Sequence, residues 1–161
     1  MSGEKLDAVI EEQERVLRFR SIDLDTISRV CCRAVERLKS MKAPCYIRAV
    51  VNKTVVFAQC LEGASCNNEE WAKRKAALCE RYWMSSLHAA RNLEKKGQTL
   101  ETCGMNNTEY GLSGGSFPIL LESGLCMGSI TVSGLKGAED HQIVVSAIAD
   151  ELGVEIPSVL E

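Results

Sequence analysis

The segment that decides the fold class reads CYIRAVV (Cys45–Val51), NK (Asn52–Lys53) and TVVFAQC (Thr54–Cys60). Two runs rich in β-branched and aromatic residues flank a two-residue turn, which is the pattern of a β-hairpin. Asn52 suits this turn because asparagine tolerates the left-handed backbone conformation that tight hairpin turns require. We therefore predict two antiparallel strands joined at Asn52.

A second hairpin is predicted nearer the C-terminal end. Two apolar runs, Phe117–Leu121 and Cys126–Val132, are separated by a turn at Glu122–Gly124. Pro118 has no backbone N–H to donate to a neighbouring strand, so its strand is expected at a sheet edge or to begin there. Two hairpins together indicate an antiparallel sheet.

The remaining elements are predicted from apolar residues at helical spacing. We expect helices over residues 4–18, 24–41, 69–96 (with a break near Ser85) and 138–152. Residues 98–114 are rich in Gly and Asn and are expected to form a loop. Helices grouped between two hairpins favour an α+β fold.

Composition is typical of an ordinary globular domain, and we treat residues 1–161 as one domain. Nineteen basic and 22 acidic residues give a net charge of −3, so no global charge attracts nucleic acid or an anionic membrane. No apolar run approaches the roughly 18 residues of a membrane span. Charges also occupy the first residues, where a signal peptide would be apolar. We expect a cytoplasmic protein without nucleic-acid partners or membrane insertion.

Eight cysteines are the unusual feature of the composition. No two are spaced as C-x-x-C, and the two histidines, His88 and His141, are far apart, so the common zinc patterns are missing. Cys31, Cys79 and Cys126 fall where the periodicity expects an apolar residue. We expect reduced, mostly buried thiols and no metal site.

A row of basic residues is the first candidate binding feature. If residues 69–93 formed one helix, Arg74, Arg81 and His88 would share a face, with Lys75 beside them, because seven residues make almost two turns. Guanidinium groups bind carboxylates and phosphates through paired N–H bonds. The alternative, favoured from the sequence, is a solvated basic face.

Two further candidates lie near the second hairpin. Gly114 and Gly115 could direct backbone N–H groups at an anionic ligand, or could simply provide a tight turn into a strand. Glu139 and Asp140 precede His141, and a histidine beside carboxylates can act as a general base or as a haem or metal ligand. Equally, these acids can complement a helix N-terminus. Both interpretations stay open, and no catalytic constellation is visible.

Taken together, these segments resemble the GlcG/HbpS-like family, most closely its uncharacterised branch of haem-degrading-domain proteins. The resemblance rests on Gly114–Ile119, Gly128–Leu135 and Glu139–His141, with the upstream segments Leu61–Ser65 and Asn68–Lys75. It implies a profilin-like α+β fold with a roughly five-stranded antiparallel sheet flanked by helices, the fifth strand being expected within residues 98–112. It also implies symmetric homo-oligomers.

The resemblance makes haem the candidate cofactor, since some members bind haem and a few are credited with degrading it. The expected ligand-binding residues are Arg74, Lys75, Arg81, His88, Gly114, Gly115, Glu139, Asp140 and His141. Three functions follow. The first is a non-catalytic, oligomeric module that binds haem or another anionic small molecule. The second is an oligomeric scaffold for a protein partner, and the third and weakest is a haem-degrading enzyme.

Overall fold

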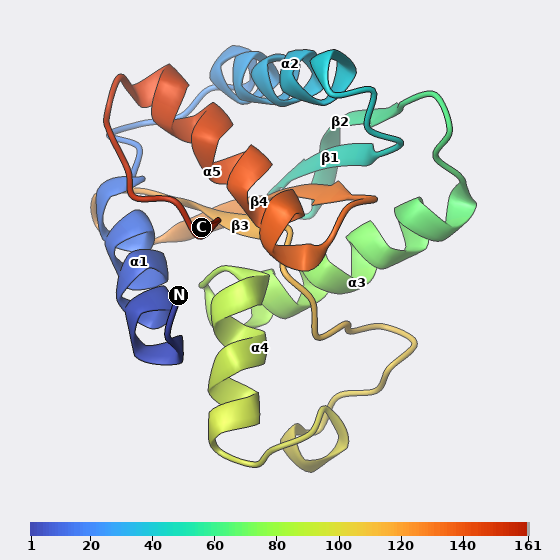
Figure 1. Ribbon diagram of the computed structural model, residues 1–161. Helices are drawn as coiled ribbons and strands as arrows, with labels where there is room; N and C mark the ends of the chain where they lie inside the picture. The colour runs from blue at the N-terminus through green and yellow to red at the C-terminus, as the bar shows by residue number, and fades with distance from the viewer. Residues whose placement is uncertain (161) are drawn as a thin grey trace.

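Two hairpins build one antiparallel sheet in the computed structural model, which describes residues 1–160 (Figure 1). The strands are β1 (Tyr46–Val51), β2 (Thr54–Cys60), β3 (Ser116–Leu120) and β4 (Cys126–Ser133). Their spatial order is β2-β1-β4-β3, so β1 and β4 join the two hairpins at the centre of the sheet. Both predicted hairpins and the α+β class are thereby confirmed.

The local signals in the hairpins act as expected. Asn52 and Lys53 both adopt left-handed conformations, with φ values of 47° and 62°, as a tight two-residue hairpin turn requires. Pro118 lies in the edge strand β3, where its lack of a backbone N–H removes no hydrogen bond from the centre of the sheet. Beyond this edge, Phe19 makes a single parallel bridge to Leu121.

The described residues form four strands, so the expectation of a fifth strand within residues 98–112 is wrong. This segment contains a short 3₁₀ helix, Glu101–Cys103, followed by turns. The side-chain oxygen of Asn106 accepts hydrogen bonds from the backbone N–H groups of Thr108 and Glu109, at 3.1 and 2.9 Å. The backbone is therefore satisfied locally by an asparagine turn rather than by a neighbouring strand.

Helices cover both faces of the sheet (Figure 1). They are α1 (Gly3–Val16), α2 (Leu24–Ser40), α3 (Cys66–Tyr82), α4 (Ser86–Lys95) and α5 (Gly137–Leu152). The main core lies between the sheet and the pair α2 and α5, and alternate strand residues such as Ile47, Ala49, Ile130 and Val132 point into it. The helix α3 covers the opposite face.

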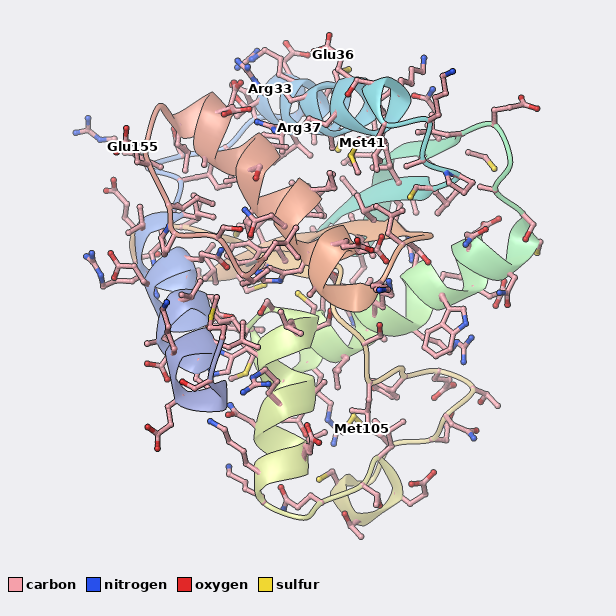
Figure 2. All side chains as sticks on the ribbon, viewed as in Figure 1. Arg33, Glu36, Arg37, Met41, Met105 and Glu155 are labelled. Atoms are coloured by element: carbon pink, nitrogen blue, oxygen red, sulfur yellow. The ribbon has the colours of Figure 1, made fainter. Side chains whose placement is uncertain are left out.

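Surface ion pairs join α2 to α5. Arg33 and Arg37, which project from α2 in Figure 2, pair with Glu151 and Asp150 near the C-terminal end of α5. A second, smaller apolar cluster lies between α3, α4 and the 98–112 loop, and Met105 of this loop, beside α4 in Figure 2, is buried in it. This cluster packs the loop against α3 and α4.

The predicted break in the long central helix is confirmed. Trp83 ends α3 in the left-handed conformation, with φ 56° and ψ 33°. Ser85 then begins α4, because its hydroxyl accepts a hydrogen bond from the N–H of His88 at 3.1 Å. Arg81 and His88 therefore belong to different helices, and the single row of basic residues does not form.

The cysteines are free thiols in the described chain, and their burial varies. Cys31, Cys45 and Cys79 are buried, Cys103 and Cys126 are partly exposed, and the other three are exposed. The expectation of mostly buried thiols therefore holds for Cys31, Cys45 and Cys79 but not for the other five. Burial raises the pKa of Cys31 and of Cys45 to about 12, which keeps both thiols protonated and unreactive.

Among residues 1–160, no helix is both long enough and apolar enough to cross a membrane.

Candidate functional site

A hollow of about 200 Å³ opens where α3 meets the loop between β4 and α5. We call it the Lys75 hollow. Its lining residues are Asn68, Trp71, Lys75, Ser113, Ser133, Gly134 and Leu135. The volume is smaller than the roughly 300–1,000 Å³ of pockets for drug-sized ligands. It suits a small polar molecule, or one arm of a larger molecule.

The base of this hollow carries a buried ion pair. The ammonium of Lys75, whose residue is 3% exposed, lies 2.7 Å from Oδ2 of Asp140, which is fully buried. The ammonium also donates to the carbonyl oxygen of Val132 at 3.3 Å. A lysine ammonium has three N–H bonds, and these two oxygens account for two of them.

Asp140 orients both the ammonium and the loop above it. Besides Lys75, its carboxylate accepts hydrogen bonds from the backbone N–H groups of Leu135 at 3.0 Å and Gly134 at 3.4 Å. Burial raises the pKa of Asp140, and the neighbouring Lys75 ammonium opposes this shift. The carboxylate therefore holds the β4–α5 loop closed over the end of β4 and fixes the direction of the lysine.

Glycine is required beside this ion pair. Gly115 has φ 129°, and a Cβ atom there would lie 2.5 Å from the carbonyl oxygen of Val132 and 2.9 Å from Nζ of Lys75. At Gly114 a Cβ atom would lie 2.6 Å from the carbonyl oxygen of Gly137. Both glycines allow chain segments to approach closely, so the structure favours the conformational interpretation of this pair over the anion-cradle interpretation.

The two arginines of the predicted row hold the 98–112 loop. The guanidinium of Arg74 lies 3.9 Å from the ring centroid of Trp71 and donates to the carbonyl oxygen of Asn107 at 3.4 Å. Arg81 donates to the carbonyl oxygen of Cys103 at 2.9 Å. Arg74 therefore lies beside the Lys75 hollow through its stacking on Trp71, whereas Arg81 serves the loop.

His88 connects α4 to α1 and does not line the Lys75 hollow. Its Nδ1 lies 2.8 Å from Oε2 of Glu14, and Oε1 of the same carboxylate accepts the N–H of Ser85 at 2.7 Å. The hydrogen bond to Glu14 raises the pKa of His88. This histidine therefore fastens α1 against the start of α4.

His141 lies in the core. The imidazole is fully buried, with its ring 5.9 Å from that of Phe117 in an edge-on arrangement. Its Nε2 lies 2.7 Å from Oε1 of Gln13, and the amide of Gln13 in turn donates to the carbonyl oxygen of Pro157 at 2.8 Å. Because Gln13 offers an acceptor, Nε2 carries the proton. Nδ1 has no hydrogen-bond partner within residues 1–160, and burial lowers the pKa to about 3.

The position of Glu139 supports the interpretation that the acidic pair complements the start of a helix. Its Oε2 accepts the backbone N–H of Lys136 at 3.0 Å and so caps the start of α5. Of the predicted site residues, the structure therefore places Asp140 and Gly115 against Lys75, and of these three Lys75 lines the hollow, with Gly114 and Arg74 adjacent. It places Arg81, His88 and His141 elsewhere.

Sequence analysis did not single out several residues of the hollow. Asn68 and Trp71 precede the predicted Lys75 at the spacing i, i+3 and i+7, which places all three on one face of α3, and this spacing was the available signal. Ser113, Ser133 and Leu135 carry no local signal, because only the pairing of β4 and the docking of the loop bring them to α3.

Comparisons with known proteins agree with this architecture. A family model described as "Haem degrading protein HbpS-like" matches residues 22–149. A UPF0303 protein of Rhizobium rhizogenes is 39% identical over 145 residues, covering 89% of each chain. The crystal structure of the Ybr137w protein has a TM-score of 0.82 at 21% identity and covers 95% of each chain. That of a PduOC:Heme complex has a TM-score of 0.68 at 20% identity, covering 86% of this chain and 98% of the other.

Proposed function

The chain belongs to the HbpS-like family, as its motifs predicted, and on this premise we propose that it is a non-catalytic module that binds a small carboxylate-bearing molecule in the Lys75 hollow. The observation that carries the proposal is the Lys75 ammonium itself. It is buried, it is already paired with Asp140, it lines a polar hollow, and it has one N–H beyond the two that Asp140 and Val132 accept.

The physical case rests on preorganisation. Removing a lysine charge from water is costly, but Asp140 already compensates this cost in the free protein. A ligand carboxylate would therefore gain a charge-assisted hydrogen bond from an ammonium that does not need to reorient. The hydroxyl of Ser133 lies in the same lining, and the ring of Trp71 offers an apolar wall.

Haem is the ligand that the family description and the haem complex of a structural neighbour suggest. Haem iron needs an axial histidine, cysteine, methionine or tyrosine. None of these lines the Lys75 hollow within residues 1–160, and the two histidines are engaged with Glu14 and Gln13. The hollow therefore fits a haem carboxylate arm but does not fit haem iron.

The test fills the hollow with a side chain. We would titrate acetate, succinate and benzoate, and separately haem with albumin as competitor, into the reduced protein and into Ser113→Phe. Ser123→Phe, in the exposed β3–β4 turn, is the matched control. We expect one carboxylate to bind the parent and the control, and to bind Ser113→Phe at least about tenfold more weakly. Equal binding by all three proteins, or none, would refute the proposal.

The same experiment decides between a carboxylate arm and an iron ligand. Haem binding that survives albumin, and that is lost in His88→Ala or His141→Ala, would replace the proposed site by a histidine-ligated one. Haem binding that is lost in Ser113→Phe and indifferent to both histidine variants agrees with docking through a carboxylate arm. The thiols must be kept reduced, because eight cysteines offer adventitious haem ligands.

One observation favours self-association, which the scaffold function would also need. The outer edge of β2 is unpaired within the described chain, and its seven residues include neither a charge nor a proline. In natural proteins that stay monomeric, an edge strand usually carries charged residues or proline, which prevent it from pairing with another chain. We infer a homo-oligomer in which this edge pairs with another copy. Sedimentation should show it, and Val55→Lys should shift the population to monomers. A parent protein that is already monomeric would contradict the inference.

A cytoplasmic location stays a prediction.

A further inference from the structure

A second hollow, of about 300 Å³, lies at the other end of α3. We call it the Glu80 hollow. It forms where the end of α3 faces the β1–β2 turn and the start of β4, and it is lined by Asn52, Lys53, Glu80, Trp83, Cys126, Met127 and Gly128. It shares no lining residue with the Lys75 hollow. Its volume is at the lower end of the roughly 300–1,000 Å³ range of ligand pockets.

Glu80 is an incompletely compensated charge in this hollow. Its carboxyl is half-buried and forms no ion pair within the described part of the chain, and burial raises its pKa. Arg48 and Lys53 favour the charged form only from a distance. A half-buried carboxylate without a close cation is costly, so an ammonium placed beside it by a ligand would lower the free energy of the site.

A buried hydroxyl lies close to this carboxyl. Ser129 is 1% exposed, and its hydroxyl favours the charged form of Glu80. Ser129 therefore supports the carboxylate of Glu80 but supplies no positive charge.

The opposite walls are held in an uncommon backbone geometry. Four non-glycine residues among residues 1–160 have positive φ, and three of them, Asn52, Lys53 and Trp83, line the Glu80 hollow. The turn is anchored because the N–H of Asn52 donates to the carbonyl oxygen of Met127 at 2.8 Å. Asn52 and Lys53 take these angles as the residues of a tight hairpin turn, and Trp83 takes them as the residue that ends α3. Here they place a lysine and an indole that is 51% exposed around one carboxyl.

We propose that the Glu80 hollow binds a small zwitterion of the α-amino acid class. The Glu80 carboxylate accepts the ligand ammonium, the Lys53 ammonium binds the ligand carboxylate, and the Trp83 ring contacts the apolar side chain. Because the two charges come from different walls, a turn and a helix, a ligand with only one charge leaves one wall without a partner. The proposal does not depend on the function proposed for the Lys75 hollow.

The two tryptophans of the chain make the test specific, because Trp71 lines the Lys75 hollow and Trp83 lines the Glu80 hollow. Protein labelled with 5-fluorotryptophan gives one ¹⁹F signal from each, assigned by Trp71→Phe and Trp83→Phe. The probes are norleucine, pentylamine, which lacks its carboxylate, and hexanoate, which lacks its amine. We expect norleucine to shift the ¹⁹F signal of Trp83, and the shift to reach saturation. Pentylamine and hexanoate should each bind at least about tenfold more weakly than norleucine.

Three variants check the residues. Glu80→Gln and Lys53→Gln should each weaken norleucine binding about tenfold. Lys42→Gln, another exposed lysine with positive φ but outside the hollow, should leave it unchanged. Lys53 is exposed, so its variant keeps the result interpretable if Glu80→Gln fails to fold.

Several results would overturn the proposal. These are the absence of a saturable shift at Trp83, pentylamine or hexanoate binding as tightly as norleucine, and wild-type binding by both charge variants. A Trp83 shift that appears only as protein concentration rises would assign the hollow to a second copy of the chain instead. Failure at the Lys75 hollow is scored separately at Trp71, so neither proposal is refuted by the other.

Discussion

Acidification should destabilise this protein through His141, because burial makes the pKa of this histidine lower in the fold than in the unfolded chain. The imidazole is neutral in the fold, because burial lowers its pKa from 6.5 to about 3. In the unfolded chain the same group takes up a proton below about pH 6.5. Stability from this group is therefore fully present above that pH and is lost as the pH falls toward 3.

The magnitude follows from the width of this interval. Each pH unit between the two pKa values costs about 1.4 kcal/mol, so at about pH 5 the loss is about 2 kcal/mol. This figure is the same for any folded pKa well below 5. His88 acts in the opposite direction. Its pKa is raised by Glu14, so its contribution is present below about pH 6.5 and is lost as the pH rises through its folded pKa.

The assay is urea unfolding at about pH 7.5 and about pH 5, analysed by linear extrapolation. The variant is His141→Gln, whose amide can still donate to Gln13 but does not titrate. We expect the parent to lose about 2 kcal/mol more than the variant between the two pH values, since every other titrating group cancels in the comparison. Equal losses in parent and variant would refute the neutral, buried imidazole.

Three other outcomes follow from described contacts. Lys75→Met should lower the free energy of unfolding by about 3–5 kcal/mol by leaving Asp140 buried and unpaired, and adding Asp140→Asn should restore much of it in urea unfolding. Lys42→Gly should raise it by about 0.5–1 kcal/mol in the same assay, because φ there is 53°. Gly128→Ala should yield insoluble protein on expression, because its Cβ would lie 1.8 Å from the carbonyl oxygen of Val50. Soluble, normally melting protein would contradict this last expectation.

Local signals were sufficient for most of the fold. The Asn52 turn, the edge position of Pro118 and the break before Ser85 each depend on one residue's backbone preference, and each appears as predicted. The absent fifth strand is different. It was expected from a family resemblance, whereas the local chemistry of Asn106 already favoured a turn.

The candidate site was harder to predict, because its members meet only through tertiary structure. Lys75 and Asp140 are far apart in sequence and pair only when α3 and α5 dock on the same end of β4. His141 follows Asp140 directly, yet it is buried in the core against Gln13. No sequence pattern shows that one of two adjacent helical residues serves a site while the other serves packing.

The order of strands in the sheet also bears on the order in which the strand pairs form during folding. Each hairpin closes over a short turn, so β1–β2 and β3–β4 form at small cost in loop-closure entropy. The central pairing of β1 with β4 brings Tyr46 opposite Ser133, and it closes a loop that contains α3, α4 and the 98–112 segment. Distant pairing generally slows folding, so we expect substitutions along the β1–β4 seam to alter the rate of stopped-flow refolding more than those in either turn.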